Sequence, residues 1–262
     1  MSTVVFSNQK GGVGKSTLAV LFAHWLVDKQ AQRVCVLDLD SQCNTSKTLA
    51  KYDCGVNTTT LFQPQPIAIT EDATTALVLF PGAKALVDLE RGKPNAMFPA
   101  FRQHVAVLNR NFDTVVIDTP SALGLCMGAA LFAADYVTCP IELEEYSLDG
   151  VTGMLKTIFG MRQKHNPSLK LLGVLPNRFN PRSVRQKEAL EELIAHYAEF
   201  VMPCKISTRS AIPQALAAGE PVWRLAKSSA REASLEVQHA FEVLWERMGA
   251  APGDGGGVTD ED

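Results

Sequence analysis

A glycine-rich loop between a short β-branched segment and an apolar helix constrains this chain more than any other feature. The loop spans residues 9–17 (QKGGVGKST), after residues 3–6 and before residues 18–27. A strand, a glycine turn and a helix N-terminus in this order direct unpaired backbone N–H groups into one concavity. Glycine lets the backbone close around a polyphosphate without Cβ clashes. The pattern predicts a nucleotide site in which Lys15 reaches the β- and γ-phosphates and the Ser16 hydroxyl binds Mg²⁺.

The loop departs from the usual phosphate-loop spacing in one specific way. Gln9 stands where the strict pattern has its first glycine, and a second lysine, Lys10, precedes the glycine pair. This KGGxGK[ST] form resembles the deviant phosphate loop of the ParA/MinD family of ATPases. In that family the extra lysine reaches across a dimer interface to the phosphates of the partner's nucleotide. The resemblance therefore implies an ATP-dependent sandwich homodimer in which Lys10 acts on the partner's ATP.

Two acidic segments follow apolar strands. Residues 34–37 lead into residues 38–42 (DLDSQ), which resemble the family's D-x-D-P-Q segment with a serine at the proline position. The resemblance assigns Asp40 to positioning the attacking water. Residues 112–118 end in Asp118, in the form of a Walker B strand whose carboxylate holds the Mg²⁺ shell. The next residues, 121–124, would then sense the γ-phosphate.

The resemblance covers residues 3–247 and completes the predicted site. Asn177 matches the family's adenine-contacting asparagine. The predicted catalytic residues are Lys10, Lys15 and Asp40, and the predicted Mg²⁺ residues are Ser16 and, through water, Asp118. The predicted nucleotide-binding residues are Lys10, Gly11, Gly12, Val13, Gly14, Lys15, Ser16, Thr17 and Asn177.

Short continuous apolar runs alternate with helical patterns, which predicts an α/β fold: a doubly wound, mostly parallel sheet flanked by helices. The phosphates would lie at the carboxyl ends of the strands. We expect one ATPase domain over residues 1–249 and a disordered acidic tail over residues 250–262. Within the first helix, residues 16–29, we expect His24 and Asp28 on the solvent face. Residues 52–76 support no functional prediction. The expected strands are 3–7, 34–37, 77–80, 112–118, 133–140 and 171–175, and the other expected helices are 43–51, 98–110, 182–199 and 229–248.

Composition argues against several classes of protein. The hydrophobic fraction of 46% and the charged fraction of 20% are globular values. Six cysteines without CxxC spacing predict reduced thiols, and Cys126 and Cys139 are expected to be buried rather than to hold an iron–sulfur cluster. No apolar run approaches the ~18 residues of a membrane span, and no basic region precedes the first apolar segment. We therefore expect a protein of the bacterial cytoplasm without a membrane partner.

Positive charge is concentrated in the C-terminal half. Residues 156–231 contain 13 Lys/Arg and 5 Asp/Glu, although the whole chain has a net charge of −3. Such groups suffice for sequence-independent, salt-sensitive contacts with phosphates, and solvated helix faces are the alternative interpretation. The resemblance favours nucleoid DNA, although Ala211 stands where the family usually has an arginine. The candidate DNA contacts are Arg182, Arg185, Lys187, Arg209, Arg224 and Arg231.

A ParA-type ATPase is the function that these features together predict. ATP would close the dimer, and the dimer would associate with the nucleoid. A cargo-associated ParB-like or adaptor protein, together with DNA, would stimulate a weak intrinsic hydrolysis. The cargo could be a plasmid, a chromosome or a protein organelle such as the carboxysome. A MinD-like membrane-cycling regulator is the alternative, disfavoured because the final helix and tail are acidic and anionic lipid would repel them.

Overall fold

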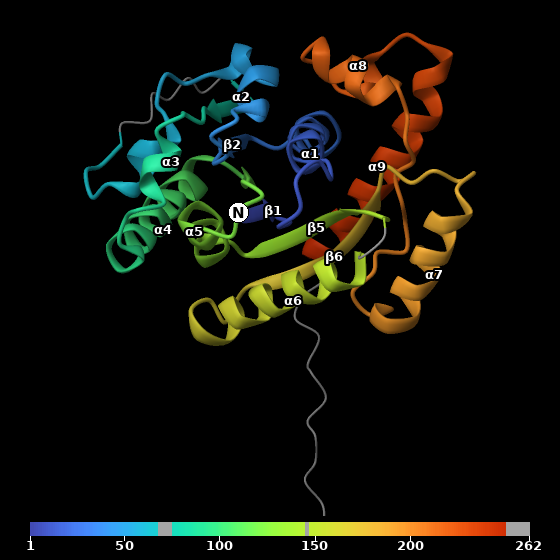
Figure 1. Ribbon diagram of the computed structural model, residues 1–262. Coiled ribbons are helices and arrows are strands. Elements are labelled where there is room, and N and C mark those ends of the chain that lie inside the picture. The colour runs from blue at the N-terminus through green and yellow to red at the C-terminus, as the bar shows by residue number, and fades with distance from the viewer. Residues whose placement is uncertain (68–74, 145–146, 250–262) are drawn as a thin grey trace, which may run out of the picture.

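Six parallel strands in the order β3-β2-β4-β1-β5-β6 form the centre of the computed structural model, which describes residues 1–67, 75–144 and 147–249 (Figure 1). This sheet confirms the predicted α/β class, and each expected strand is present with small changes in its bounds. The strands are β1 (Ser2–Phe6), β2 (Val34–Asp38), β3 (Leu77–Phe80), β4 (Thr114–Asp118), β5 (Tyr136–Glu142) and β6 (Lys170–Asn177).

Helices connect the strands and cover both faces of the sheet, and the expected helices are confirmed within a few residues. The α-helices are α1 (Lys15–Gln30), α2 (Asn44–Thr48), α3 (Leu86–Leu89), α4 (Pro94–Asn111), α5 (Leu125–Ala133), α6 (Ser147–Lys164), α7 (Val184–Tyr197), α8 (Ala211–Ala217) and α9 (Ser228–Gly249). The short 3₁₀ helices are η1 (Ala50–Tyr52), η2 (Thr58–Phe62) and η3 (Val222–Arg224). Among the described residues, no helix is both long and apolar enough to cross a membrane.

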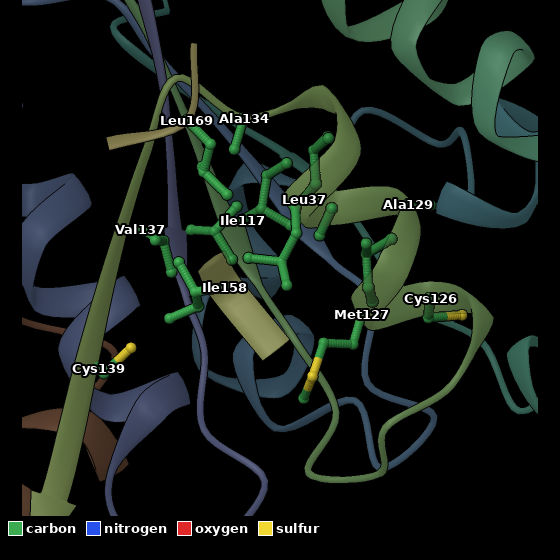
Figure 2. Packing of buried hydrophobic residues seen from close by; sticks show 14 of the residues in the cluster. Leu37, Ile117, Cys126, Met127, Ala129, Ala134, Val137, Cys139, Ile158 and Leu169 are labelled. Carbon is green, nitrogen blue, oxygen red and sulfur yellow. The ribbon is translucent and has the colours of Figure 1, made fainter. Parts of the chain in front are cut away.

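The side chains of each strand point alternately to the two faces of the sheet, and they form two hydrophobic cores, one on each face. Val115 and Ile117 of β4 point toward α4, α5 and α6, whereas Val116 between them points toward α1 and α9. Successive strand side chains face opposite sides, so a strand covered on both faces must be apolar throughout. Figure 2 shows the first of these cores, where Ile117 and Val137 lie near Ile158 of α6. The buried cysteines Cys126 and Cys139 belong to it, which confirms their predicted burial.

Strand register gathers the site residues at one edge of the sheet. Phe6 at the end of β1 pairs with Asp118 at the end of β4, and Asp118 pairs in turn with Asp38 at the end of β2. The loop after β1 therefore emerges beside Asp118, with Asp38 one strand further along, at the carboxyl edge where open α/β sheets bind their ligands.

The expectation that His24 lies on the solvent face of α1 is wrong. Its side chain is 1% exposed and makes an edge contact with the ring of Tyr52. Asp28 is also partly buried, because it accepts hydrogen bonds from the Trp223 indole (2.8 Å) and from Arg224 (2.5 Å). The physical reason is that α1 is covered from several sides. The tail predicted for residues 250–262 lies outside the described residues.

Candidate nucleotide-binding site

The glycine loop after β1 adopts a conformation that other residues would resist. Gly12 and Gly14 have φ values of 80° and 96°, in the left-handed region that favours glycine. At Gly14 the space is also restricted, since a Cβ atom there would lie 2.3 Å from Nδ2 of Asn177. The Asn177 amide donates a hydrogen bond to the Val13 carbonyl (2.8 Å) and is itself buried. Thus Asn177, which the sequence predicts to contact the adenine, lies against the loop and fixes its backbone.

Lys15 begins α1 and turns back into the loop. Its ammonium donates hydrogen bonds to the Lys10 carbonyl (3.3 Å) and to the Ser121 hydroxyl (2.9 Å), and the residue is only 6% exposed. Burial lowers the pKa of Lys15, while the nearby charges of Asp118 and Asp40 oppose that shift. A buried cation whose hydrogen-bond acceptors within the described part of the chain are all neutral is suited to an anionic ligand.

Asp38 and Asp118 form a buried acidic pair beneath the loop. Asp118 accepts a hydrogen bond from the Thr45 hydroxyl (2.8 Å), and Asp38 accepts from the Ser46 hydroxyl (2.6 Å) and the Ser46 amide (2.8 Å). Burial and the charge of Asp38 raise the pKa of Asp118, and interactions with the hydroxyls of Ser16 and Thr45 oppose the shift. Two adjacent buried carboxylates repel each other, so a cation near them would favour their ionised forms.

The residues around Asp118 fit a magnesium ion. Its Oδ1 atom is buried and has no hydrogen-bond partner within the described part of the chain. The hydroxyl of Ser16 and the carboxylates of Asp118 and Asp40 are hard oxygen donors of the kind that Mg²⁺ prefers. No cluster of three or more His, Cys, Asp or Glu with metal-binding geometry occurs among the described residues. An Mg²⁺ ion here would therefore take its remaining ligands from phosphate and water.

Two adjoining cavities open beside the loop. The first, of about 380 Å³, is lined by Lys15, Ser16 and Asp40, together with residues of α2. The second, of about 350 Å³, is lined by Asn177 and by residues 207–210 and 212–213. Both include Thr17, Arg178 and Leu216 in their walls, so they meet at the N-terminus of α1. One cavity suits the phosphates and the other suits the nucleoside.

Lys10 is directed away from both cavities. Its backbone is held by Asn8, whose side-chain oxygen accepts from the Lys10 amide (2.8 Å). Its ammonium forms an ion pair with Glu144, which lies just after β5, and both side chains are about half exposed (50% and 52%). Lys10 thus lies on the rim, and Asp118 is buried beneath the loop. The predicted site residues that line the two cavities are Gly12, Gly14, Lys15, Ser16, Thr17, Asp40 and Asn177.

The six candidate DNA contacts divide into two groups. Arg209 is paired with Glu232 and Glu236, and Arg224 is paired with Asp28 and Glu220. Carboxylates of the same chain thus neutralise much of the charge of these two arginines. The remaining four are exposed, just before α7, in its first turn and at the start of α9, and they are Arg182, Arg185, Lys187 and Arg231.

Sequence reasoning did not assign several residues that the structure places at the site. Asp38 and Arg178 lie in segments whose neighbours Asp40 and Asn177 received the predicted roles. Arg178 has φ 54°, unusual for a residue with a side chain, and it lines both cavities. Thr45, Ser46 and Glu144 received no role, because their contacts depend on the fold.

This fold and this loop define a phosphate-loop α/β protein with a nucleotide site at the carboxyl edge of its sheet. Residues 1–171 match a family described as an AAA domain. Protein IncC of Escherichia coli is 39% identical over 257 residues, which cover 95% of this chain and 70% of that protein. The chromosome-partitioning ATPase Soj of Thermus thermophilus is 31% identical over 249 residues, which cover 94% of each. The chain belongs to the ParA/MinD family of ATPases, with ParA-type partition proteins among its relatives.

Solved structures share this fold. Apo McdA of Cyanothece superposes with a TM-score of 0.79 at 21% identity, covering 95% of this chain and all of that one, which supports the fold. Cobyrinic acid a,c-diamide synthase of Mycobacterium smegmatis, solved with an ATP analogue and magnesium, has a TM-score of 0.74 at 25% identity and covers 95% of this chain and 96% of its own.

Proposed function

We propose that this chain is a ParA-type ATPase that closes into a dimer around two ATP molecules. In that state it would bind nucleoid DNA and position or segregate a cargo with a partner protein that stimulates hydrolysis. The observation that carries the proposal is the divergence of two lysines from one loop. Lys15 is buried in the cradle, whereas Lys10 lies on the rim. A site that served only its own nucleotide would have no use for the rim lysine.

Binding of ATP would use both cavities. The backbone N–H groups of the loop and the Lys15 ammonium would hold the β- and γ-phosphates. The adenosine would occupy the second cavity, beside Asn177 and Arg178. Mg²⁺ would be held by Ser16 and, through water, by Asp118; when bound, it would bridge phosphate oxygens and neutralise developing negative charge.

Hydrolysis would depend on Asp40, which lies in the wall of the phosphate cavity. Its Oδ1 atom accepts a hydrogen bond from the Gln42 amide (2.9 Å), which fixes the carboxylate. A fixed carboxylate beside the γ-phosphate can orient the attacking water, while positioning and charge neutralisation lower the barrier.

Asp40→Ala is expected to bind ATP and dimerise, but to hydrolyse ATP about 100-fold or more slowly than the wild type. The reason is that the carboxylate acts on water in the transition state and contributes little to ground-state binding. Single-turnover hydrolysis measured with saturating ATP tests this prediction. Asp40→Asn keeps an oxygen for the Gln42 amide and should also be slow. Normal turnover in either variant would assign the role to another group.

DNA binding is expected to require ATP and to weaken steeply with salt, because it would rest on phosphate contacts. Reversing two exposed charges, Arg182→Glu with Arg185→Glu, should lower the slope of log K against log salt by about 2, with ATP binding unchanged. Fluorescence anisotropy with two unrelated duplexes would measure it. The control reverses two exposed charges outside the basic region, Lys29→Glu with Arg91→Glu. Equal slopes for both double variants would remove this surface from the DNA site.

The whole proposal is tested by the oligomeric state of the wild-type protein. Light scattering should report a dimer with a non-hydrolysable ATP analogue and Mg²⁺, and a monomer with ADP. A monomer under both conditions would reject the sandwich dimer.

A further inference from the structure

The two lysines of the phosphate loop have different kinds of partner. Lys15 is bound by two neutral oxygens within the cradle, the Lys10 carbonyl and the Ser121 hydroxyl. Lys10 is bound by a carboxylate, that of Glu144, at the surface. The rim lysine therefore already has a negatively charged partner in the single chain, before any nucleotide of a second chain arrives.

Glu144 is well placed to keep this contact. It lies two residues after the end of β5, the strand beside β1, so the loop after β1 and the segment after β5 emerge next to each other. The hydrogen bond and the charge of Lys10 lower the pKa of Glu144, and Arg185 of α7 adds a smaller effect in the same direction. Glu144 is thus ionised at neutral pH and attracts the Lys10 ammonium.

We propose that Glu144 is the resting counter-ion of Lys10 and competes with the phosphates of the partner's ATP for it. This inference rests on the proposed function, in which Lys10 acts across the dimer interface. In the monomer the ammonium pairs with Glu144. When two ATP-loaded chains meet, each Lys10 exchanges its carboxylate for the partner's phosphates. Glu144 is then a residue that sets the threshold for dimerisation, and it makes no contact with the reacting atoms.

Electrostatics predicts whether loss of the Glu144 charge strengthens or weakens the dimer. Removing the negative charge of Glu144 frees Lys10, and it also removes an anion from the surface that the partner's triphosphate must approach. Both effects favour the ATP-bound dimer. A residue that merely oriented Lys10 for its task would act in the opposite direction, because its loss would weaken the dimer.

The expected change in the dissociation constant of the dimer follows from the exposure of the Lys10–Glu144 ion pair. Exposed ion pairs are weak, and two equivalent pairs are broken in a symmetric dimer. Glu144→Gln should therefore lower the dissociation constant of the dimer with a non-hydrolysable ATP analogue by about 2- to 30-fold. In the Lys10→Ala background the same Glu144→Gln change should tighten the dimer less than it does in the wild type, because only the removal of the surface anion remains when the lysine is absent.

Glu220→Gln is the matched control. Glu220 also forms an exposed ion pair with a lysine, Lys51, but away from the phosphate loop. Analytical ultracentrifugation of the wild type and the three variants over a range of protein concentrations gives the dissociation constants. A Glu144→Gln dimer that is no tighter than the wild-type dimer overturns the exchange, as does an equal gain in Glu220→Gln.

A second measurement tests the pairing without the dimer. In the nucleotide-free protein, trace acetylation followed by mass spectrometry should label Lys10 about 2- to 5-fold faster in Glu144→Gln, because the amine is no longer held by a carboxylate. Unchanged labelling of Lys10 would refute the pairing. If labelling rises but the wild type remains monomeric with the ATP analogue, the sandwich dimer fails, and the exchange fails with it. A wild-type dimer that Glu144→Gln does not tighten rejects the exchange alone.

Discussion

Lys15→Ala is expected to weaken ATP binding by about 30- to 5,000-fold, equivalent to about 2–5 kcal/mol, the usual cost of removing one partner of a buried, hydrogen-bonded charge pair. The structure explains why the effect should be large. Lys15 is 6% exposed, and its present acceptors are neutral. A triphosphate would supply the negative charge that this buried ammonium lacks. Isothermal titration with ATP and Mg²⁺ measures the loss.

Lys29→Ala is the matched control for that experiment. Lys29 lies on the same helix, but in its last turn and exposed to solvent. Its replacement should leave ATP affinity within about two-fold, because exposed charges contribute little. Thermal unfolding of both variants checks that the fold persists. If Lys15→Ala binds ATP as tightly as the control, the glycine loop is not the phosphate site.

The phosphate site could be predicted from sequence because its determinants are local. Glycines at fixed spacing encode the positive φ values at Gly12 and Gly14. Apolar runs that end in an aspartate encode buried strands, and parallel strands bring their carboxyl ends to one edge. That rule places Asp38 and Asp118 in register without knowledge of any side-chain contact.

The features that the sequence did not predict depend on contacts between distant segments of the chain. Helical periodicity placed His24 on a solvent face, but residues 18–26 of α1 are all buried, because the sheet, α9 and η1 surround that part of the helix. Similarly, Arg224 resembles a free surface cation in the sequence. It donates a hydrogen bond to Asp28, 196 positions away, and this carboxylate neutralises much of its charge. Neither pairing follows from composition or spacing.

The rim lysine gives the second large effect that we expect. Lys10→Ala should bind ATP as a monomer, while dimerisation, DNA binding and stimulated hydrolysis are lost together. Lys10 takes no part in the two cavities that would hold its own nucleotide, so ATP affinity should stay close to that of the wild type. In a two-fold dimer each chain would lose one contact between an ammonium and a phosphate. Two such contacts amount to about 3–6 kcal/mol, or about 10²- to 10⁴-fold in the dissociation constant of the dimer.

The dependence on ATP has the same origin. Without nucleotide, the two Lys15 ammonium groups would repel each other across the interface and each Lys10 would remain paired with Glu144, whereas bound triphosphates supply negative charge that attracts both lysines. Light scattering with a non-hydrolysable ATP analogue therefore separates Lys10→Ala from the wild type. Lys51→Ala is the control, since it also removes an exposed lysine paired with a glutamate but leaves the loop unchanged. An intact Lys10→Ala dimer would show that the rim lysine does not act on the partner's ATP, whereas loss of the dimer in both variants would indicate a general effect of surface charge.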